Sequence, residues 1–189
     1  ALPNLCPHFH LSMQSGCDSV LARMNRKYDS ARYYKSVKLL NEAYEAPGIT
    51  TDLIVGFPGE TEEEFQQTLA FIRRCAFSAM HIFPYSRRPG TPADGMPGQI
   101  LNSIKEERAH RAQQTALEME AAYLDRWVGQ TVPVLFEEER DGLWRGHTTR
   151  YSEVAAPSGE DLHNQLRQVY ITGRAGNILQ GELCEGQEK

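Results

Sequence analysis

Residues 49–60, Ile-Thr-Thr-Asp-Leu-Ile-Val-Gly-Phe-Pro-Gly-Glu, join a short apolar segment directly to a Gly-x-Pro-Gly turn. Ile49 and the run 53–55 are typical of a strand that is buried on both faces. Gly56 and Gly59 let the backbone turn sharply where a Cβ atom would obstruct a ligand. The stretch therefore predicts a buried strand and, after it, a turn that is open to a ligand.

A helix is expected to begin directly after this turn. Thr61, followed three residues later by Glu64, has the pattern of a capping box, in which each side chain bonds the backbone N–H of the other residue. Ligands of open α/β sheets and of α/β barrels bind at the carboxyl ends of strands, where such turns lie. The alternative is an ordinary connection without a ligand, because a short motif is a hypothesis until its context is known.

The segments around the turn alternate between strand and helix patterns. Three strands that alternate with helices favour parallel pairing and an α/β fold. In the last predicted helix, the spacing of Leu117, Ala121, Leu124 and Val128 indicates a packed stripe. The other predicted elements are strands over 9–13, 49–55 and 79–83, a short helix from Asp18, and helices from Ser30, over 61–74 and over 100–127.

From Gly129 the pattern changes to short alternating segments that are separated by turn residues. About five short strands of this kind are typical of a small antiparallel barrel of the OB type. We therefore predict one domain over 1–128 and a second over 129–189. The five predicted strands are 131–136, 143–148, 152–155, 168–172 and 178–183.

The three predicted parallel strands are too few to close a barrel, and the first of them would leave an apolar edge. We therefore expect residues 1–128 to be the back half of a larger domain.

Composition limits the class of protein. With 40% hydrophobic and 24% charged residues, the 189-residue chain is typical of a soluble globular protein. No apolar run approaches the roughly 20 residues of a membrane span, and residue 1 is not followed by a signal-peptide pattern, so we expect a cytoplasmic location. A net charge of −5 argues against a globally basic nucleic-acid binder, although a local basic face stays compatible with it.

The cysteines predict neither a metal site nor a disulfide framework. They are scattered, without a Cys-x-x-Cys pair or a Cys/His cluster, and His8 and His10 alone are too few ligands for a zinc site. We expect mostly structural, reduced thiols at Cys6, Cys17, Cys75 and Cys184.

Four blocks of sequence, in this order, resemble the radical S-adenosylmethionine methylthiotransferases over nearly the full chain. They are His10-Leu-Ser-Met-Gln-Ser-Gly-Cys-Asp18, Arg23-Met-Asn-Arg-Lys-Tyr28, Thr51-Asp-Leu-Ile-Val-Gly-Phe-Pro-Gly-Glu-Thr61 and Tyr85-Ser-Arg-Arg-Pro-Gly-Thr-Pro-Ala93. The resemblance implies the C-terminal half of a radical SAM partial (β/α)6 barrel.

The tail resembles the RNA-binding TRAM barrel that ends these enzymes. The matching segments are Gly146-His-Thr-Thr-Arg-Tyr-Ser-Glu-Val154 and Leu179-Gln-Gly-Glu-Leu183. Within the family, the variants around Ser12, at Met24–Tyr28 and at His81–Tyr85 look most like the branch that modifies N6-threonylcarbamoyladenosine at position 37 of tRNA. The sister branch, which acts on isopentenyladenosine, more often carries Pro where Ser12 stands.

The resemblance implies S-adenosylmethionine and 4Fe–4S clusters as cofactors, with tRNA and an electron donor as partners. The family holds its radical cluster with a Cys-x-x-x-Cys-x-x-Cys loop, which this sequence lacks. The resemblance therefore implies a C-terminal fragment that contains no cluster ligand and no identifiable catalytic residue, and that is inactive alone.

The resemblance also implies roles for residues at the strand ends. Ser12 and Gln14 match positions near the ribose and methionine of the cofactor, although both could simply tie the turn together. Backbone groups of Ile54, Val55 and Gly56 could bond the adenine edge.

Asp52 could brace that loop, or it could be a buried carboxylate bonded to backbone. Tyr85 follows the last strand, where the cofactor or an RNA backbone could approach. Arg87 and Arg88 suit either ligand, because a guanidinium binds oxyanions in a bidentate fashion.

In the predicted barrel, Arg145, Arg150 and Tyr151 are candidates for phosphate contact and base stacking. The row Glu137–Glu139 makes this segment acidic, so an RNA-binding face must be local. Two other interpretations stay open: an RNA-binding module without catalysis, and another radical-enzyme branch that shares the Gly-Phe-Pro-Gly turn.

Overall fold

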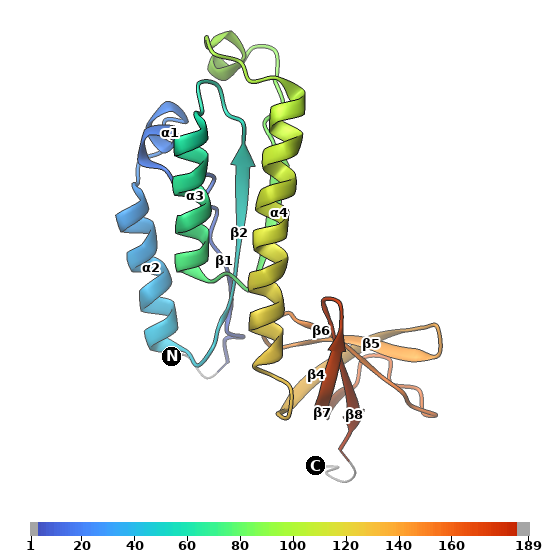
Figure 1. The fold of residues 1–189 in the computed structure, drawn as a ribbon. Helices are drawn as coiled ribbons and strands as arrows, with labels where there is room; N and C mark the ends of the chain where they lie inside the picture. Colours follow the sequence, from blue (N-terminus) through green and yellow to red (C-terminus); the bar gives the residue numbers. More distant parts are fainter. Residues whose placement is uncertain (1–3, 185–189) are drawn as a thin grey trace. The chain divides into compact units, whose positions relative to one another are not determined.

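A computed structural model describes residues 4–184 of the chain (Figure 1). The chain divides into two compact units. One unit is Phe9–Met119, and the other contains, among the described residues, 120–184 together with 4–8. Each unit has its own hydrophobic core. The predicted domain boundary near residue 128 stays a prediction.

The first unit is built on a three-stranded sheet in the order β1-β2-β3, with β2 and β3 parallel. This confirms the predicted α/β class with parallel pairing. Strand β1 is shorter than predicted, although the chain beyond it still bonds β2 through Leu11 and Gln14. The elements are β1 (His8–His10), α1 (Asp18–Arg23), α2 (Ser30–Ala43), β2 (Gly48–Val55), α3 (Glu62–Cys75), β3 (Ala79–Pro84), a 3-10 turn (Pro92–Gly95) and α4 (Asn102–Asp125).

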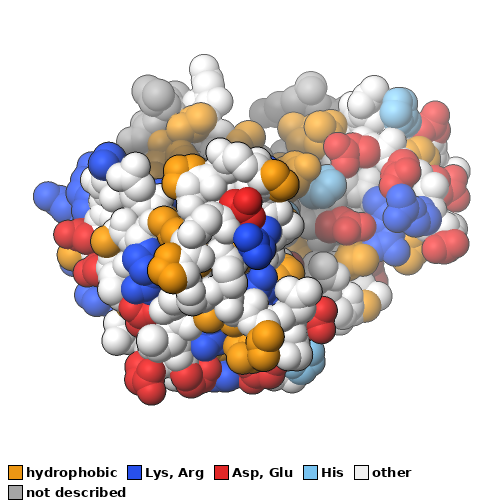
Figure 2. Space-filling model, turned by 90° about the horizontal axis from the view of Figure 1, so that it is seen from above, with side chains coloured by type: hydrophobic (Ala, Val, Ile, Leu, Met, Phe, Trp, Pro, Cys, Tyr) orange, Lys and Arg blue, Asp and Glu red, His pale blue; other side chains and the backbone are white. Residues whose placement is uncertain are grey.

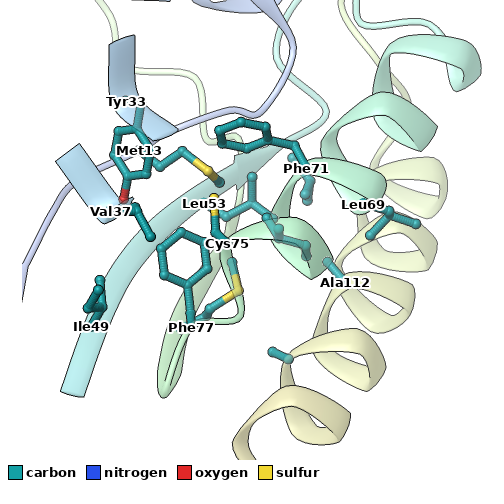
Figure 3. Packing of buried hydrophobic residues seen from close by; sticks show 14 of the residues in the cluster. Met13, Tyr33, Val37, Ile49, Leu53, Leu69, Phe71, Cys75, Phe77 and Ala112 are labelled. Atoms are coloured by element: carbon teal, nitrogen blue, oxygen red, sulfur yellow. The ribbon is translucent and has the colours of Figure 1, made fainter. Parts of the chain in front are cut away.

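Helices α2, α3 and α4 cover one face of this sheet. Figure 3 shows Leu53 of β2 among Phe71, Cys75 and Phe77, with Ala112 of α4 close by. Strand β2 is buried at alternate residues, not on both faces as predicted, because the helices cover one face only. Ile54 is therefore half-buried on the open face.

Helix α4 packs differently from the prediction. Leu117 and Val128 are 50% and 40% exposed, so the predicted stripe is wrong at these two positions, although Leu124 is buried. The buried face of the helix combines small residues with the aliphatic stems of two cations in place of leucines. The side chains of α4 that are buried in the first unit belong to Lys105, Arg108, Ala112, Thr115 and Ala116.

The second unit is a closed barrel in the order β4-β5-β6-β8-β7. This confirms a small barrel, with one difference, since β6 and β8 pair in parallel. In a closed ring with an odd number of strands, directions cannot alternate everywhere, so one neighbouring pair must be parallel. The strands are β4 (Thr131–Arg140), β5 (Leu143–Thr148), β6 (Glu153–Ala156), β7 (Leu166–Ala175) and β8 (Ile178–Leu183).

The predicted capping box at the start of α3 is confirmed. Thr61 Oγ1 accepts from the Glu64 N–H at 3.2 Å, and Glu64 Oε2 accepts from the Thr61 N–H at 2.9 Å. The same carboxylate receives both Nη atoms of Arg23, at 3.0 and 2.5 Å. The hydrogen bonds from Arg23, followed by those from Ser19 and the Thr61 backbone, lower the pKa of Glu64 to about 2.

We expect Glu64→Gln to lower the free energy of unfolding at neutral pH by about 1–3 kcal/mol, because it removes the charge that Arg23 and the helix start require. The folded pKa lies below the ordinary value of 4.5, so this stability is present above pH 4.5 and is lost as pH falls towards 2. Urea unfolding of both proteins should show a difference at pH 7 that disappears by about pH 2. The exposed neighbour Glu63→Gln serves as control, and a pH-independent difference for Glu64→Gln would contradict the assignment.

Candidate functional site

The turn after β2 is sharp because two glycines adopt the left-handed conformation. Gly56 has φ +71° and Gly59 has φ +74°. A Cβ atom on Gly56 would lie 2.4 Å from Cγ of Lys105, whose stem crosses the turn. Both the backbone conformation and the space therefore require glycine at position 56.

A buried ion pair holds this turn. Glu60 Oε1 accepts from the Gly56 N–H at 2.8 Å and from Nη1 of Arg108 at 2.8 Å, and the same Nη1 donates to the Glu60 carbonyl at 3.1 Å. The side chains of Glu60 and Arg108 are only 2% and 6% exposed. Burial raises the pKa of Glu60, while the Gly56 N–H and Arg108 act in the opposite direction.

A cleft of about 520 Å³ lies at the carboxyl end of β2 and β3. It brings together five residues that the sequence predicts for the cofactor or RNA, and the prediction missed Phe83, Pro84, Ser86, Thr91 and Ala93. The polar, Pro-rich loop that follows β3 is the signal for the last three, whereas Phe83 and Pro84 end β3 itself. The lining residues are Gln14, Asp52, Ile54, Phe83, Pro84, Tyr85, Ser86, Arg88, Thr91 and Ala93.

Polar side chains on the open face of the sheet hold Asp52 at the cleft. Ser12 Oγ donates to Asp52 Oδ2 at 3.2 Å, and His10 Nε2 lies 3.2 Å from both atoms. Gln14, with φ +69°, donates its N–H to the Asp52 carbonyl at 2.9 Å. Ser12 is therefore outside the cleft lining and acts on it through Asp52.

Backbone donors near the predicted adenine wall already have acceptors. The Ile54 N–H donates to the Gln14 carbonyl at 2.9 Å, and the Gly56 N–H donates to Glu60. Val55 is fully buried, and its carbonyl accepts from the Tyr85 N–H at 2.8 Å. Of the predicted wall, only Ile54 lines the cleft. Because the Gly56 N–H is already bonded and the Val55 side chain is buried, a ligand could contact these two residues only through their carbonyl oxygens, which can accept a second hydrogen bond.

The loop after β3 carries the arginines. Arg87 Nε lies 2.8 Å from Asp94 Oδ1, and its Nη2 donates to the Asp94 carbonyl at 2.9 Å. Arg88 lines the cleft. Figure 2, seen from above, shows basic, acidic and hydrophobic side chains interspersed over this end of the first unit. The loop therefore offers local cations and no broad basic surface.

The predicted RNA-binding residues of the barrel have protein contacts of their own. Nη1 of Arg145 lies 3.4 Å from Glu153, and the guanidinium of Arg150 stacks over the Trp127 ring at 4.4 Å. Tyr151 is 66% exposed, has φ +64° and stacks on the ring of His147 at 4.5 Å. The Tyr151 ring also stacks on the ring of His8 at 5.1 Å, so two histidine rings already contact it, and a base would have to displace one of them or contact the exposed edge.

Among residues 4–184, no group of three or more His, Cys, Asp or Glu side chains is arranged to hold a metal ion. Cys17 and Cys75 are buried, while Cys6 and Cys184 are exposed. These residues do not fit an iron–sulfur cluster. In the same part of the chain, no helix is long and apolar enough to span a membrane.

Comparison with known proteins gives a consistent result. Residues 2–72 match the Radical SAM superfamily. The chain is 37% identical over 191 residues to the threonylcarbamoyladenosine tRNA methylthiotransferase MtaB of Bacillus subtilis, covering 94% of this chain and 42% of that protein. It is 43% identical over 205 residues to a tRNA-2-methylthio-N(6)-dimethylallyladenosine synthase of Oleidesulfovibrio alaskensis, covering 96% of this chain and 44% of that protein.

A third relative, MtaB of Thermotoga maritima, is 45% identical over 135 residues, which are 71% of this chain and 31% of that protein. The chain thus spans less than half the length of these relatives. The matches confirm the resemblance to radical SAM tRNA methylthiotransferases that the four sequence blocks indicate. Both branches occur among the relatives, so the matches do not separate them.

We expect Arg108→Met to lower the free energy of unfolding by about 3–5 kcal/mol at pH 7, because it leaves the Glu60 carboxylate buried without its cation. The loss should shrink at pH 5, since the pKa of Glu60 is already raised by burial and rises further without Arg108. A raised folded pKa favours the folded state as pH falls, because the folded protein then binds more protons. Urea unfolding at both pH values measures the effect.

Arg111→Met is the matched control, because its partners Glu62 and Glu107 are exposed and such pairs contribute at most about 1 kcal/mol. The double variant Glu60→Gln/Arg108→Met should be more stable at pH 7 than Arg108→Met alone. Equal stability of these two variants would show that the carboxylate is not the origin of the loss.

Proposed function

We propose, from its relationship to the radical SAM tRNA methylthiotransferases, that this chain is part of an enzyme that adds a 2-methylthio group to an N6-modified adenosine at position 37 of tRNA. The observation that carries the proposal is the cleft at the carboxyl end of β2 and β3. Eight of its ten lining residues belong to the four blocks that resemble the family. Its volume of about 520 Å³ suits a ligand of the size of S-adenosylmethionine.

The chemistry of the cleft fits this cofactor. The carboxylate of Asp52 and the amide of Gln14 are suited to ribose hydroxyl and amino groups, and Arg88 is suited to a carboxylate. Ile54 and Phe83 provide apolar surface for a base. Ser12 positions Asp52 through its hydrogen bond. The backbone of Val55 and Gly56 offers carbonyl oxygens, and the Tyr85 side chain forms one wall of the cleft.

When bound, S-adenosylmethionine and a 4Fe–4S cluster would supply the radical chemistry. In our proposal the cluster ligands lie outside residues 4–184, and this chain binds, orients and shields the cofactor. An electron donor and a cytoplasmic location belong to the same proposal.

RNA binding is assigned to two places. Arg87 and Arg88 lie in the loop beside the cleft, where a guanidinium can bind phosphate. On the barrel, we assign base contact to Tyr151, which is 66% exposed, and phosphate contact to Arg145 and Arg150 on neighbouring strand and turn positions. The barrel would then act as a TRAM domain.

We take N6-threonylcarbamoyladenosine as the substrate. The support is the resemblance around Ser12, whose hydroxyl donates to Asp52 at 3.2 Å. A proline, more frequent at this position in the isopentenyladenosine branch, cannot make this bond. The alternative substrate, N6-dimethylallyladenosine, is named by relatives that are equally similar.

Nucleoside mass spectrometry of tRNA tests the proposal. Cells that lack the gene encoding this chain should lose the 2-methylthio derivative of N6-threonylcarbamoyladenosine and accumulate its precursor. Complementation with the whole gene should restore the product, and complementation with Asp52→Ala should restore roughly a tenth of it or less, because the acceptor of the Ser12 and His10 contacts is removed. Loss of the dimethylallyl derivative instead would assign the other branch, and no change in either nucleoside would leave a non-catalytic RNA-binding module.

The location of the cluster ligands is tested on the chain itself. We expect no stable 4Fe–4S absorption after incubation of the 189-residue chain with iron, sulfide and reductant, because its described residues contain no ligand group. A stoichiometric cluster that survives gel filtration would falsify the assignment of the ligands to another segment.

A further inference from the structure

A second pocket, of about 410 Å³, shares Pro84, Tyr85 and Ser86 with the cofactor cleft but lies towards the start of α4. We propose that this pocket binds a phosphate group of the RNA through the ammonium of Lys105. The inference rests on the proposed function, in which RNA approaches this end of the sheet. The pocket is lined by Pro84, Tyr85, Ser86, Arg87, Asn102, Lys105 and Glu106.

Lys105 is buried without an anionic partner. The residue is only 5% exposed, and its stem packs against Gly56. Its Nζ donates to Asn102 Oδ1 across a long 3.5 Å, and within residues 4–184 no carboxylate lies within 4.0 Å of it. The nearby Glu60 carboxylate is already bonded to Arg108. A buried ammonium in this state gains much from an anion.

Tyr85, which lines the same pocket, carries a second incomplete group. Its ring lies 5.4 Å from Nζ of Lys105, and its hydroxyl is buried without a hydrogen-bond partner in the described chain. A buried donor that lacks a partner costs free energy until an acceptor arrives. The Ser86 hydroxyl and the Asn102 amide line the pocket as further donors. One cation with several neutral donors is the set that a phosphate requires.

The neighbouring charges favour a phosphodiester of a polymer over an isolated small anion. Arg87 lines the pocket and is 56% exposed at its side chain, while Arg88 lines the adjacent cleft. Successive phosphates of an RNA strand can therefore meet cations on both sides of Tyr85. Glu106 also lines the pocket, and its charge weakens the binding of a free anion that has no second contact.

The first experiment titrates inorganic phosphate into the full 189-residue chain and follows the amide signals of Gly56 and Lys105 by NMR. We expect saturable shifts, roughly tenfold weaker binding for Lys105→Met, and several-fold tighter binding for Glu106→Gln. Lys38→Met, which removes an exposed lysine of α2, is the matched control and should bind like the parent. Tyr85→Phe, which keeps the ring and removes the unpaired hydroxyl, should also weaken phosphate binding. This second variant keeps the test valid if Lys105→Met fails to fold.

The second experiment measures binding of an anticodon stem-loop RNA to the same variants at several salt concentrations. Lys105→Met should reduce the slope of log affinity against log salt by about one, whereas Lys38→Met should not. Competition with S-adenosylhomocysteine tests for a cofactor carboxylate as the true ligand. If this compound displaces phosphate from the parent chain, or if Lys105→Met and Tyr85→Phe bind phosphate and RNA like the parent, the proposal is overturned.

Neither readout depends on methylthiolation. If Lys105→Met loses phosphate binding while deletion of the gene leaves the tRNA nucleosides unchanged, the phosphate site stands and the proposed activity fails. The reverse result, an active enzyme whose chain ignores phosphate, would refute the pocket and leave the activity standing.

Discussion

The buried bond between Glu60 and Arg108 is the constraint on which the first unit depends. One carboxylate oxygen receives both the Arg108 guanidinium and the Gly56 N–H, so the turn after β2 and helix α4 share one acceptor. The end of β2 is fixed by this contact, and Asp52 and Ile54 are thereby presented to the cleft. The charge is costly to bury, but its two partners come from segments that are distant in the sequence, and the contact joins them at one oxygen.

Local features of the fold were predictable and distant ones were not. The capping box of Thr61 and Glu64 lies within four residues, so its chemistry is visible in the sequence. Arg108 is 48 residues from Glu60, and nothing in the pattern of α4 marks it as buried. Leu117 illustrates the same limit, because helical periodicity predicts a stripe but the neighbouring elements decide which stripe is buried.

The candidate site follows the same division. Gln14, Asp52 and Tyr85 were predictable because they lie within or just after consecutive strand segments, and parallel strands bring their carboxyl ends to one edge. The use of the Ile54 and Gly56 N–H groups by other parts of the protein was not predictable, since it depends on how the loops close. Lys105 escaped prediction for a related reason: a lysine in a charged helical segment is ordinarily solvated.

The odd number of strands in the barrel has a mechanical consequence. Its single parallel seam joins β6 to β8 through two residue pairs, Val154 with Leu179 and Ala155 with Gln180, whereas β7 and β8 pair along most of their length. Among the five strand joints of the described barrel, this seam has the fewest paired residues. A barrel of this kind would open where β8 meets β6, and the β4-β5-β6 meander would stay paired.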